Sequence, residues 1–294
     1  MSSVGYIHSD LPVAIGNTTA SSTYISRVQS FNVTKSKPSN PVYEMGRMTS
    51  VGPGATGGEQ YSGSISWFPI GIALERALAE QAGAVNALDF ISATPEDNAA
   101  AAGLQPLIIH TPYVGLQEPR VVSLEYTFQE RADMSASAQL RGVNRLVTGS
   151  LPTMGAVPAI GSVATYKASQ IAVTVGGTAA VRAMRAVVRV QYTVEEAYQL
   201  GQATPVGARV YRPVVTADID FIASSSTAGD SELTEASPGA IGIAVNTNAI
   251  TFTLAAMYTT NIADGGQING FATKRLSYLS KGDATTGGFS VTVS

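Results

Sequence analysis

The chain has 294 residues, of which 13% are charged, with a formal net charge of −3 and no cysteine. This length is enough for two domains, each with its own core. The low charge excludes the basic footprint of a tight nucleic-acid binder, and the apolar content excludes a disordered chain. Without cysteine there are no disulfides or thiolate metal sites. We expect no signal peptide and no membrane-spanning helix, because the chain has neither a basic, apolar start nor a run of about 18 apolar residues.

Alternation of apolar and polar residues in the first half predicts β-strands with one face toward a core. The expected strands are residues 24–34, 61–68, 107–110, 121–129 and 138–147. One helix is expected at residues 69–83, because Pro69 suits a first helical turn, apolar residues follow at helical spacing and Gly83 can end it. Residues 35–41 and 52–58 are rich in turn-forming residues and are expected to be loops.

A segment rich in Pro and Gly at residues 149–161 is expected to be a linker. It separates a first domain, residues 1–160 with an irregular N-terminal arm, from a second domain, residues 161–294. The expected strands of the second domain are residues 187–194, 216–222, 249–254 and 267–279. Residues 224–229 are small and polar where the first half has its helix, so a second helix is expected to be short or absent.

Short matching pieces recur in the same order in both halves. The matched pieces are residues 13–20 with 173–180, 31–33 with 192–194, 43–52 with 198–207, 64–67 with 218–221, and 139–143 with 267–271. In the third match, five of ten positions are identical: Tyr, Gly, Thr, Val and Gly. These collinear matches predict a tandem duplication. Gly46 should then correspond to Gly201, and Gly142 to Gly270.

No motif predicts a catalytic or metal centre. Residues 52–57 match G-x-G-x-x-G but lie between two expected strands, where a nucleotide-binding loop would instead open a helix. Asp218 and Asp220 could form a carboxylate pair, yet serines stand at the matched positions of the first half. His8 and His110 are the only histidines and lack ligand spacing. We therefore expect no enzyme and no cofactor.

Several segments carry a resemblance to a known family. They are residues 24–30 (YISRVQS), 42–46 (VYEMG), 62–66 (SGSIS), 197–202 (AYQLGQ) and 214–219 (VVTADI). With the order of hairpin, helix and further strands, they make the chain similar to bacteriophage tail tube proteins. The resemblance implies a mainly β fold of two tandem β-sandwich or partial-barrel domains. Each would have four long lumen-lining strands, with a flanking helix at least in the first. It also implies a structural virion protein whose stacked rings conduct the genome into the host.

The resemblance implies two functional surfaces. The polar strand faces would line the lumen, where three acids against one arginine would make a weakly repelling wall that does not hold DNA. The residues expected there are Ser30, Asn32, Ser64, Ser66, Ser123, Glu125, Thr127, Arg189, Gln191, Thr193, Asp218, Asp220, Thr251 and Thr253. The long loop near residues 48–60 would reach a neighbouring subunit or ring. Its expected inter-ring residues are Thr49, Val51, Gly52, Pro53, Gly54, Gly57 and Gly58.

The internal repeat favours rings of three chains over the family's usual six. Three chains with four lining strands per half would contribute about 24 strands, which at about 4.8 Å spacing and about 45° tilt leave a bore of roughly 40 Å. That bore would admit duplex DNA. A ring of six chains is the alternative, and it requires that one half of each chain turns outward as decoration. The implied partners are further copies of the chain and tail sheath, baseplate and tape-measure proteins. The expected location is the virion tail, after assembly in the host cytoplasm.

A different class of protein also fits the strands and loops. A β-rich baseplate, capsid-decoration or adhesion module would need them too, but it does not explain matching polar faces in the two halves. An adhesion module should also expose aromatic residues at its loop tips, where this chain has Gly, Ser and Thr.

Overall fold

The structure is a computed structural model, and it describes most of the chain. The described residues are 12–17, 22–25, 27–37, 39–42, 52–56, 58–69, 74–75, 78, 107–130, 132–155, 166–180, 182–200, 202–222, 233–245, 250–265, 272–281 and 289–293. The boundary expected between the domains, at residues 160 and 161, lies outside them.

Antiparallel strands make up most of the described chain, so the prediction of a mainly β protein is confirmed. The strands of the first half are β1 (Ala14–Asn17), β2 (Thr23–Tyr24), β3 (Val28–Ser36), β4 (Ser39–Val42), β5 (Gly52–Thr56), β6 (Gln60–Trp67), β7 (Leu107–His110), β8 (Val114–Gln117), β9 (Arg120–Gln129), β10 (Ser135–Gly142) and β11 (Asn144–Val147). Those of the second half are β12 (Ile171–Val175), β13 (Thr178–Ala179), β14 (Ala183–Ala197), β15 (Gly207–Ile222), β16 (Gly239–Val245), β17 (Ile250–Gly265), β18 (Thr273–Ser280) and β19 (Phe289–Val293). A short 3-10 helix, η2 (Ala168–Gln170), precedes β12.

Helix is scarce among the described residues. Within the expected helix at residues 69–83, Leu74, Glu75 and Leu78 are helical and buried. The described chain contains no helix that is both long and apolar enough to cross a membrane.

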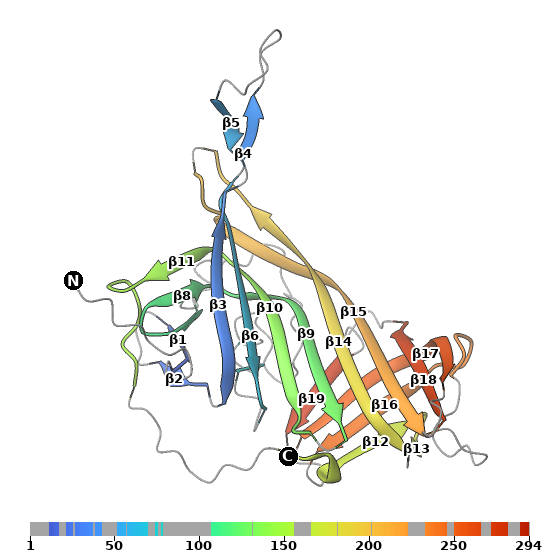
Figure 1. Ribbon diagram of the computed structural model, residues 1–294. Helices are drawn as coiled ribbons and strands as arrows, with labels where there is room; N and C mark the ends of the chain where they lie inside the picture. The colour runs from blue at the N-terminus through green and yellow to red at the C-terminus, as the bar shows by residue number, and fades with distance from the viewer. Residues whose placement is uncertain are drawn as a thin grey trace.

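One long sheet runs through both halves of the chain (Figure 1). It consists of eight neighbouring strands of a 12-stranded sheet, in the order β3-β6-β10-β9-β14-β15-β18 and the second part of β17, and the term long sheet is used for these eight only. The first four belong to the first half and the last four to the second, and β9 joins them by pairing with β14. In each group the strands lie in the same order: first, second, fourth and third along the chain.

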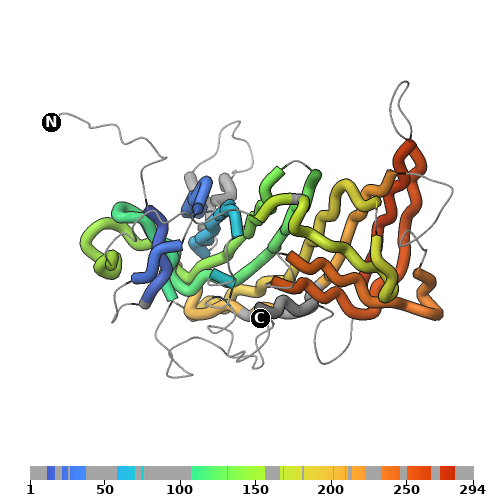
Figure 2. The backbone as a smooth tube through the Cα atoms, turned by 90° about the horizontal axis from the view of Figure 1, so that it is seen from below, coloured from blue at the N-terminus to red at the C-terminus, as the bar shows by residue number. Residues whose placement is uncertain are grey.

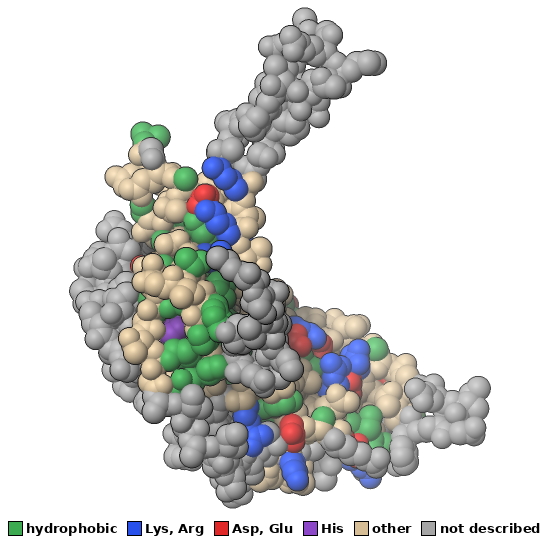
Figure 3. All heavy atoms as spheres, turned by 60° about the vertical axis from the view of Figure 1, so that its left-hand side comes forward, with side chains coloured by type: hydrophobic (Ala, Val, Ile, Leu, Met, Phe, Trp, Pro, Cys, Tyr) green, Lys and Arg blue, Asp and Glu red, His purple; other side chains and the backbone are tan. Residues whose placement is uncertain are grey.

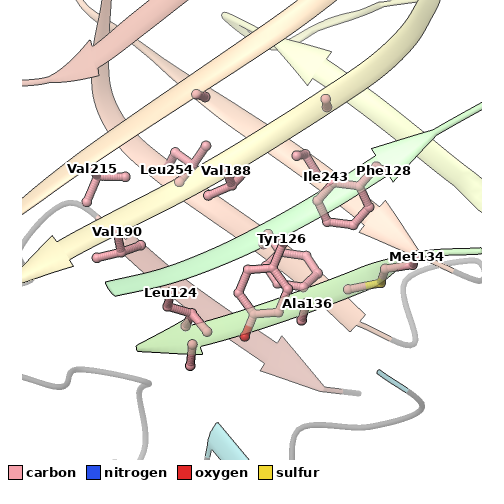
Figure 4. Packing of buried hydrophobic residues seen from close by; sticks show 14 of the residues in the cluster. Leu124, Tyr126, Phe128, Met134, Ala136, Val188, Val190, Val215, Ile243 and Leu254 are labelled. Carbon is pink, nitrogen blue, oxygen red and sulfur yellow. The ribbon is translucent and has the colours of Figure 1, made fainter. Parts of the chain in front are cut away.

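Second layers cover one face of the long sheet (Figure 2). In the first half this layer is the five-stranded sheet β11-β8-β7-β1-β2. In the second half it is made by β13, β12, β16 and β19 with the first part of β17. The rings of Phe252 on β17 and Tyr126 on β9 meet edge to face with centroids 4.7 Å apart. Buried aliphatic side chains surround Tyr126 (Figure 4), so the core lies between the layers.

Strand pairing tests the matches between the halves position by position. Ser66 and Asp220 are equivalent positions. Ser66 pairs with Ser30 and Asp220 pairs with Arg185, and each pair is the first one after a register shift in its hairpin. The hairpins also close alike: Val42 pairs with Gly52, and Ala197 pairs with Gly207. These closing pairs enclose residues 43–51 and 198–206, which are segments of equal length. The expected matches of 64–67 and 43–52 therefore agree with the pairing.

Two matches are corrected by the same pairing. Counting from Ser30 and Arg185, the counterpart of Phe31 is Ala186, six residues before the expected Tyr192. An even shift preserves which face is apolar, so alternation could not detect the error.

The second correction concerns Gly142. The N–H groups of Val143 and Lys281, which follow β10 and β18, bond to the carbonyls of Gln117 and Ala256. Gly142 therefore corresponds to Ser280 instead of Gly270. Residues 266–271, as well as Gly46 and Gly201, lie outside the described residues.

Candidate functional site

The open face of the long sheet is polar, and we call it the polar face. Residues paired directly across antiparallel strands point to the same side of a sheet. One such row crosses six strands and contains Ser30, Ser66, Ser137, Glu125, Arg189 and Thr216. The alternating residues, such as Ile65 and Leu124, are buried on the opposite side. The sequence folds this way because alternation lets each strand bury its apolar side chains and leave its polar ones in water.

The polar face brings together twelve of the fourteen residues expected to line a lumen. They are Ser30, Asn32, Ser64, Ser66, Ser123, Glu125, Thr127, Arg189, Gln191, Thr193, Asp218 and Asp220. Thr251 and Thr253 are the exceptions. They flank Phe252, whose ring packs into the core from the second layer, so they point to the outside of that layer. They therefore do not belong to the polar face.

Ion pairs connect four strands at the middle of this face. Arg189 Nε lies 2.7 Å from Glu125 Oε2, and Arg189 Nη1 lies 2.6 Å from Asp218 Oδ2. Asp220 lies between Arg275, at 2.5 Å, and Arg185, at 3.7 Å.

These contacts act on the arginines. The hydrogen bond to Glu125 raises the pKa of Arg189, and the hydrogen bond to Asp220 raises that of Arg275. Because these side chains are partly exposed, each pair is worth only about 0 to 1 kcal/mol. The pairs therefore fix side-chain positions more than they stabilise the fold.

The sequence interpretation missed Arg185 and Arg275. Arg185 stands before the expected start of its strand, and Arg275 lies within an expected strand whose polar residues were not assigned. Three arginines thus face three acids, and the expected excess of acid at this centre is wrong. In Figure 3, basic and acidic side chains lie side by side on the surface in view.

Away from the ion pairs, the polar face carries hydroxyls and amides. On β3 and β6 the Oγ atoms of Ser30 and Ser66 are 2.7 Å apart. Asn32 pairs with Ser64, and Gln139 pairs with both Ser64 and Ser123. Such groups exchange hydrogen bonds readily with water, so this part of the face is wettable. Arg141, which pairs with Ser62, adds a charge beside it, and Val214, which pairs with Gln191, is a 46% exposed apolar residue of the same face.

The β4–β5 hairpin continues beyond the ends of β3 and β6 (Figure 1). It contains three of the expected inter-ring residues, namely Gly52, Pro53 and Gly54, whereas Thr49, Val51 and Gly57 lie outside the described residues. Gly58 has a different environment. A Cβ on it would lie 2.1 Å from the ring of Tyr198, so it packs against the second hairpin of its own chain.

A backbone hydrogen bond and a hydroxyl tie the two hairpins together. The Glu59 N–H donates to the Ala203 carbonyl at 2.7 Å. The Tyr198 hydroxyl oxygen lies 3.0 Å from the Glu59 carbonyl oxygen and 2.8 Å from Glu196 Oε2. It therefore contacts the base of the first hairpin as well as its own. The bases of the two hairpins are therefore bonded to each other where they leave the long sheet.

The other candidate residues do not form a reactive centre. Asp218 and Asp220 are each held by arginine, as described above. His110 is buried, with Nε2 2.7 Å from Ser22 Oγ, and His8 lies outside the described residues. Among the residues that the structure describes, no three His, Asp or Glu side chains gather in a group that could hold a metal ion.

Comparison with known proteins gives no assignment: no family model matches the chain, and neither does any curated protein.

Proposed function

We propose that the chain is the structural subunit of a phage tail tube, in which rings of this protein stack into a conduit for the genome. The observation that carries the proposal is the continuity of the polar face across eight strands from both halves. Beyond β15 it continues through Ser277 on β18 and Asn261 on β17, which pair in line with Asp218. A sheet that is apolar and covered on one side and polar on the other suits a tube wall, because water can fill the bore while the core stays dry.

We further propose that each half is one tube domain, within residues 1–160 and 161–294. The recurring strand order and the equal hairpin loops support a duplication. The two copies have diverged in charge: Ser64 and Ser66 of the first half correspond to Asp218 and Asp220 of the second. The charged centre therefore recurs once per chain.

A ring of three chains suits these dimensions. Eight lining strands per chain give about 24 strands in the ring and a bore of roughly 40 Å. Six chains would need about twice the circumference, or would turn half of each polar face away from the lumen. Since β9 and β14 join both halves into one sheet, turning one half outward would break this junction.

The balanced charges favour DNA passage without binding. Affinity for DNA grows with each Lys or Arg that replaces a condensed counterion on a phosphate. Here Arg185, Arg189 and Arg275 each already have a carboxylate partner within 3.7 Å. Arg189 pairs with two carboxylates, so an ion pair with a DNA phosphate would replace existing ion pairs and add little affinity.

The paired hairpins would meet the next ring, because both leave the sheet at the same end (Figure 1). Sheath, baseplate and tape-measure proteins would be the further partners, in a virion tail assembled in the host cytoplasm.

Electron microscopy of the purified protein tests this function. We expect rings or tubes with threefold symmetry, and a mass of three chains per ring. True sixfold symmetry at side-chain detail would overturn the trimer but keep the tube. Isolated monomers at every protein concentration would overturn the tube and favour a baseplate, decoration or adhesion module.

A further inference from the structure

Both ends of the long sheet lack a further partner strand among the described residues. Within the described chain, β3 pairs only with β6, and residues 261–265 of β17 pair only with β18. Unpaired N–H and C=O groups on such edges can pair with another strand. All five residues of the β17 edge are exposed, as are most residues of β3.

A junction of the same kind already exists inside the chain. By strand order, β3 is the counterpart of β14 and the second part of β17 is the counterpart of β9. These counterparts, β9 and β14, pair with each other, with Glu125 opposite Arg189. The two open edges are therefore the two sides of a junction that the chain makes once internally and leaves unmade at its ends.

The register of the missing junction follows by counting. Thr34 lies four residues after Ser30, as Arg189 lies four after Arg185. Ala263 is the counterpart of Glu125, because Ala263 pairs with Arg275 on β18 as Glu125 pairs with Ser137 on β10, two residues after matching register shifts.

We propose that β3 of one copy pairs antiparallel with residues 261–265 of β17 in a second copy, with Thr34 opposite Ala263. Ser36 then lies opposite Asn261 and Lys35 opposite Ile262. The inference rests on the proposed function in one respect: the pairing repeats around a ring and closes it. Since each copy has an even number of strands in this run, the alternation of strand directions continues unbroken from copy to copy.

Burial and charge agree with this register. Ile262 is 40% exposed, whereas its counterpart Leu124 is 1% exposed and lies on the paired strand β9. A strand added at this edge would cover Ile262 on the core side. Lys35 already pairs with Glu59 of its own chain at 2.8 Å, and it would lie diagonally across from Asp264, where it would interact favourably with this second acid.

Disulfide trapping tests the pairing, and the chain's lack of cysteine leaves no background. Thr34→Cys with Ala263→Cys should give covalent dimers and trimers on a denaturing gel after mild oxidation, with no larger ladder if the ring closes. Ser36→Cys with Asn261→Cys tests the same register at a second pair, in case the first variant does not fold. Ser62→Cys with Ala263→Cys is the matched control, because Ser62 lies one strand further in, opposite Thr34. That adds about 4.8 Å, too far for a disulfide.

The outcomes separate the two proposals. Rings in micrographs without disulfides in either test variant would overturn the edge pairing but leave the tube. Disulfides without rings would support the pairing and overturn the tube. Cross-linking of the control to the same extent as the test variants would overturn the register, and absence of both disulfides and rings would overturn both proposals.

Discussion

Glu118 and Ala256 share a left-handed backbone conformation, with φ of 49° and 50°, and each stands at the same corner of its half. Glu118 separates β8, in the second layer, from β9, in the long sheet. Ala256 lies in β17 between the part that pairs with β16 and β19 and the part that pairs with β18. Non-glycine residues adopt this conformation at a cost of about 1 to 2 kcal/mol, so the strain follows from turning the chain between layers.

Replacing Ala256 with glycine should raise the free energy of unfolding by about 0.5 to 1 kcal/mol, because relief of the left-handed strain exceeds the added entropy of the unfolded chain. Ala255→Gly is the matched control. Its backbone φ is not positive, so glycine there should lower stability by about 0.5 to 1 kcal/mol. Denaturant unfolding measures both. An equal loss in the two variants would contradict the argument.

Removing the acids of the polar face should make the proposed tube bind DNA. Among the described residues, Asp218→Asn with Asp220→Asn leaves Arg185 and Arg275 without a carboxylate partner and Arg189 with one. Short duplex fragments should then sediment with the tubes, and binding should weaken steeply as salt rises. Wild-type tubes should not retain the fragments.

The reverse variant, Arg185→Gln with Arg275→Gln, controls for loss of the ion pairs alone and should stay inert toward DNA. Equal DNA retention by the two variants would show that the charge of this face does not govern passage.

Glu75 should make stability fall as pH rises. It is buried, accepts a hydrogen bond from the Tyr126 hydroxyl at 2.9 Å, and burial raises its pKa from 4.5 to about 7. A raised folded-state pKa favours the neutral acid, so its contribution is full below about pH 4.5 and is lost as pH rises through about 7. The difference is on the order of 3 kcal/mol.

Glu75→Gln keeps a hydrogen-bond acceptor for Tyr126 without the charge. Thermal unfolding at pH 5 and pH 8 should therefore show a higher Tm for this variant than for wild type at pH 8, with little difference at pH 5. Parallel pH curves for the two proteins would rule out the assignment.

His110 should have the opposite pH dependence. Its Nδ1 lies 3.1 Å from the Thr111 carbonyl and so donates, which leaves Nε2 to accept from the Ser22 hydroxyl. Burial lowers the pKa of His110, so its contribution is present above its ordinary value of 6.5 and is lost as pH falls through the folded-state pKa.

Ser22→Ala would leave a buried ring nitrogen without a donor and should cost about 1 to 3 kcal/mol at neutral pH. The exposed Ser150→Ala should stay within about 0.5 kcal/mol of wild type. Denaturant unfolding at pH 7 compares them, and similar losses would mean that the contact to His110 stabilises nothing.

Local patterns predicted much of this molecule. Alternation along single strands, as around Ile65, identified most strands of the long sheet and their polar faces, because burial of every second side chain needs only neighbours in sequence. It missed β4 and β5, which overlap the segments 35–41 and 52–58 that are expected to be loops from their turn-forming residues. Helical spacing identified the segment that contains Leu74 and Leu78. The matched hairpin segments, which begin at Tyr43 and Tyr198, were also readable, since they depend on residue identity alone.

Relations between strands were decided only by the tertiary structure. Alternation is unchanged by an even shift, so the six-residue error at Phe31 could be found only from the strands that pair with it. The partners of Asp220 depend on β14 and β18 lying on its two sides, which no local pattern encodes. Thr251 and Thr253 are not on the polar face because the chain changes layer at Ala256, and the ring of Phe252 between them packs into the core. The sequence by itself determined which side of each strand is exposed to water. The packed sheet decided which strands lie next to each other and so contribute to one polar face.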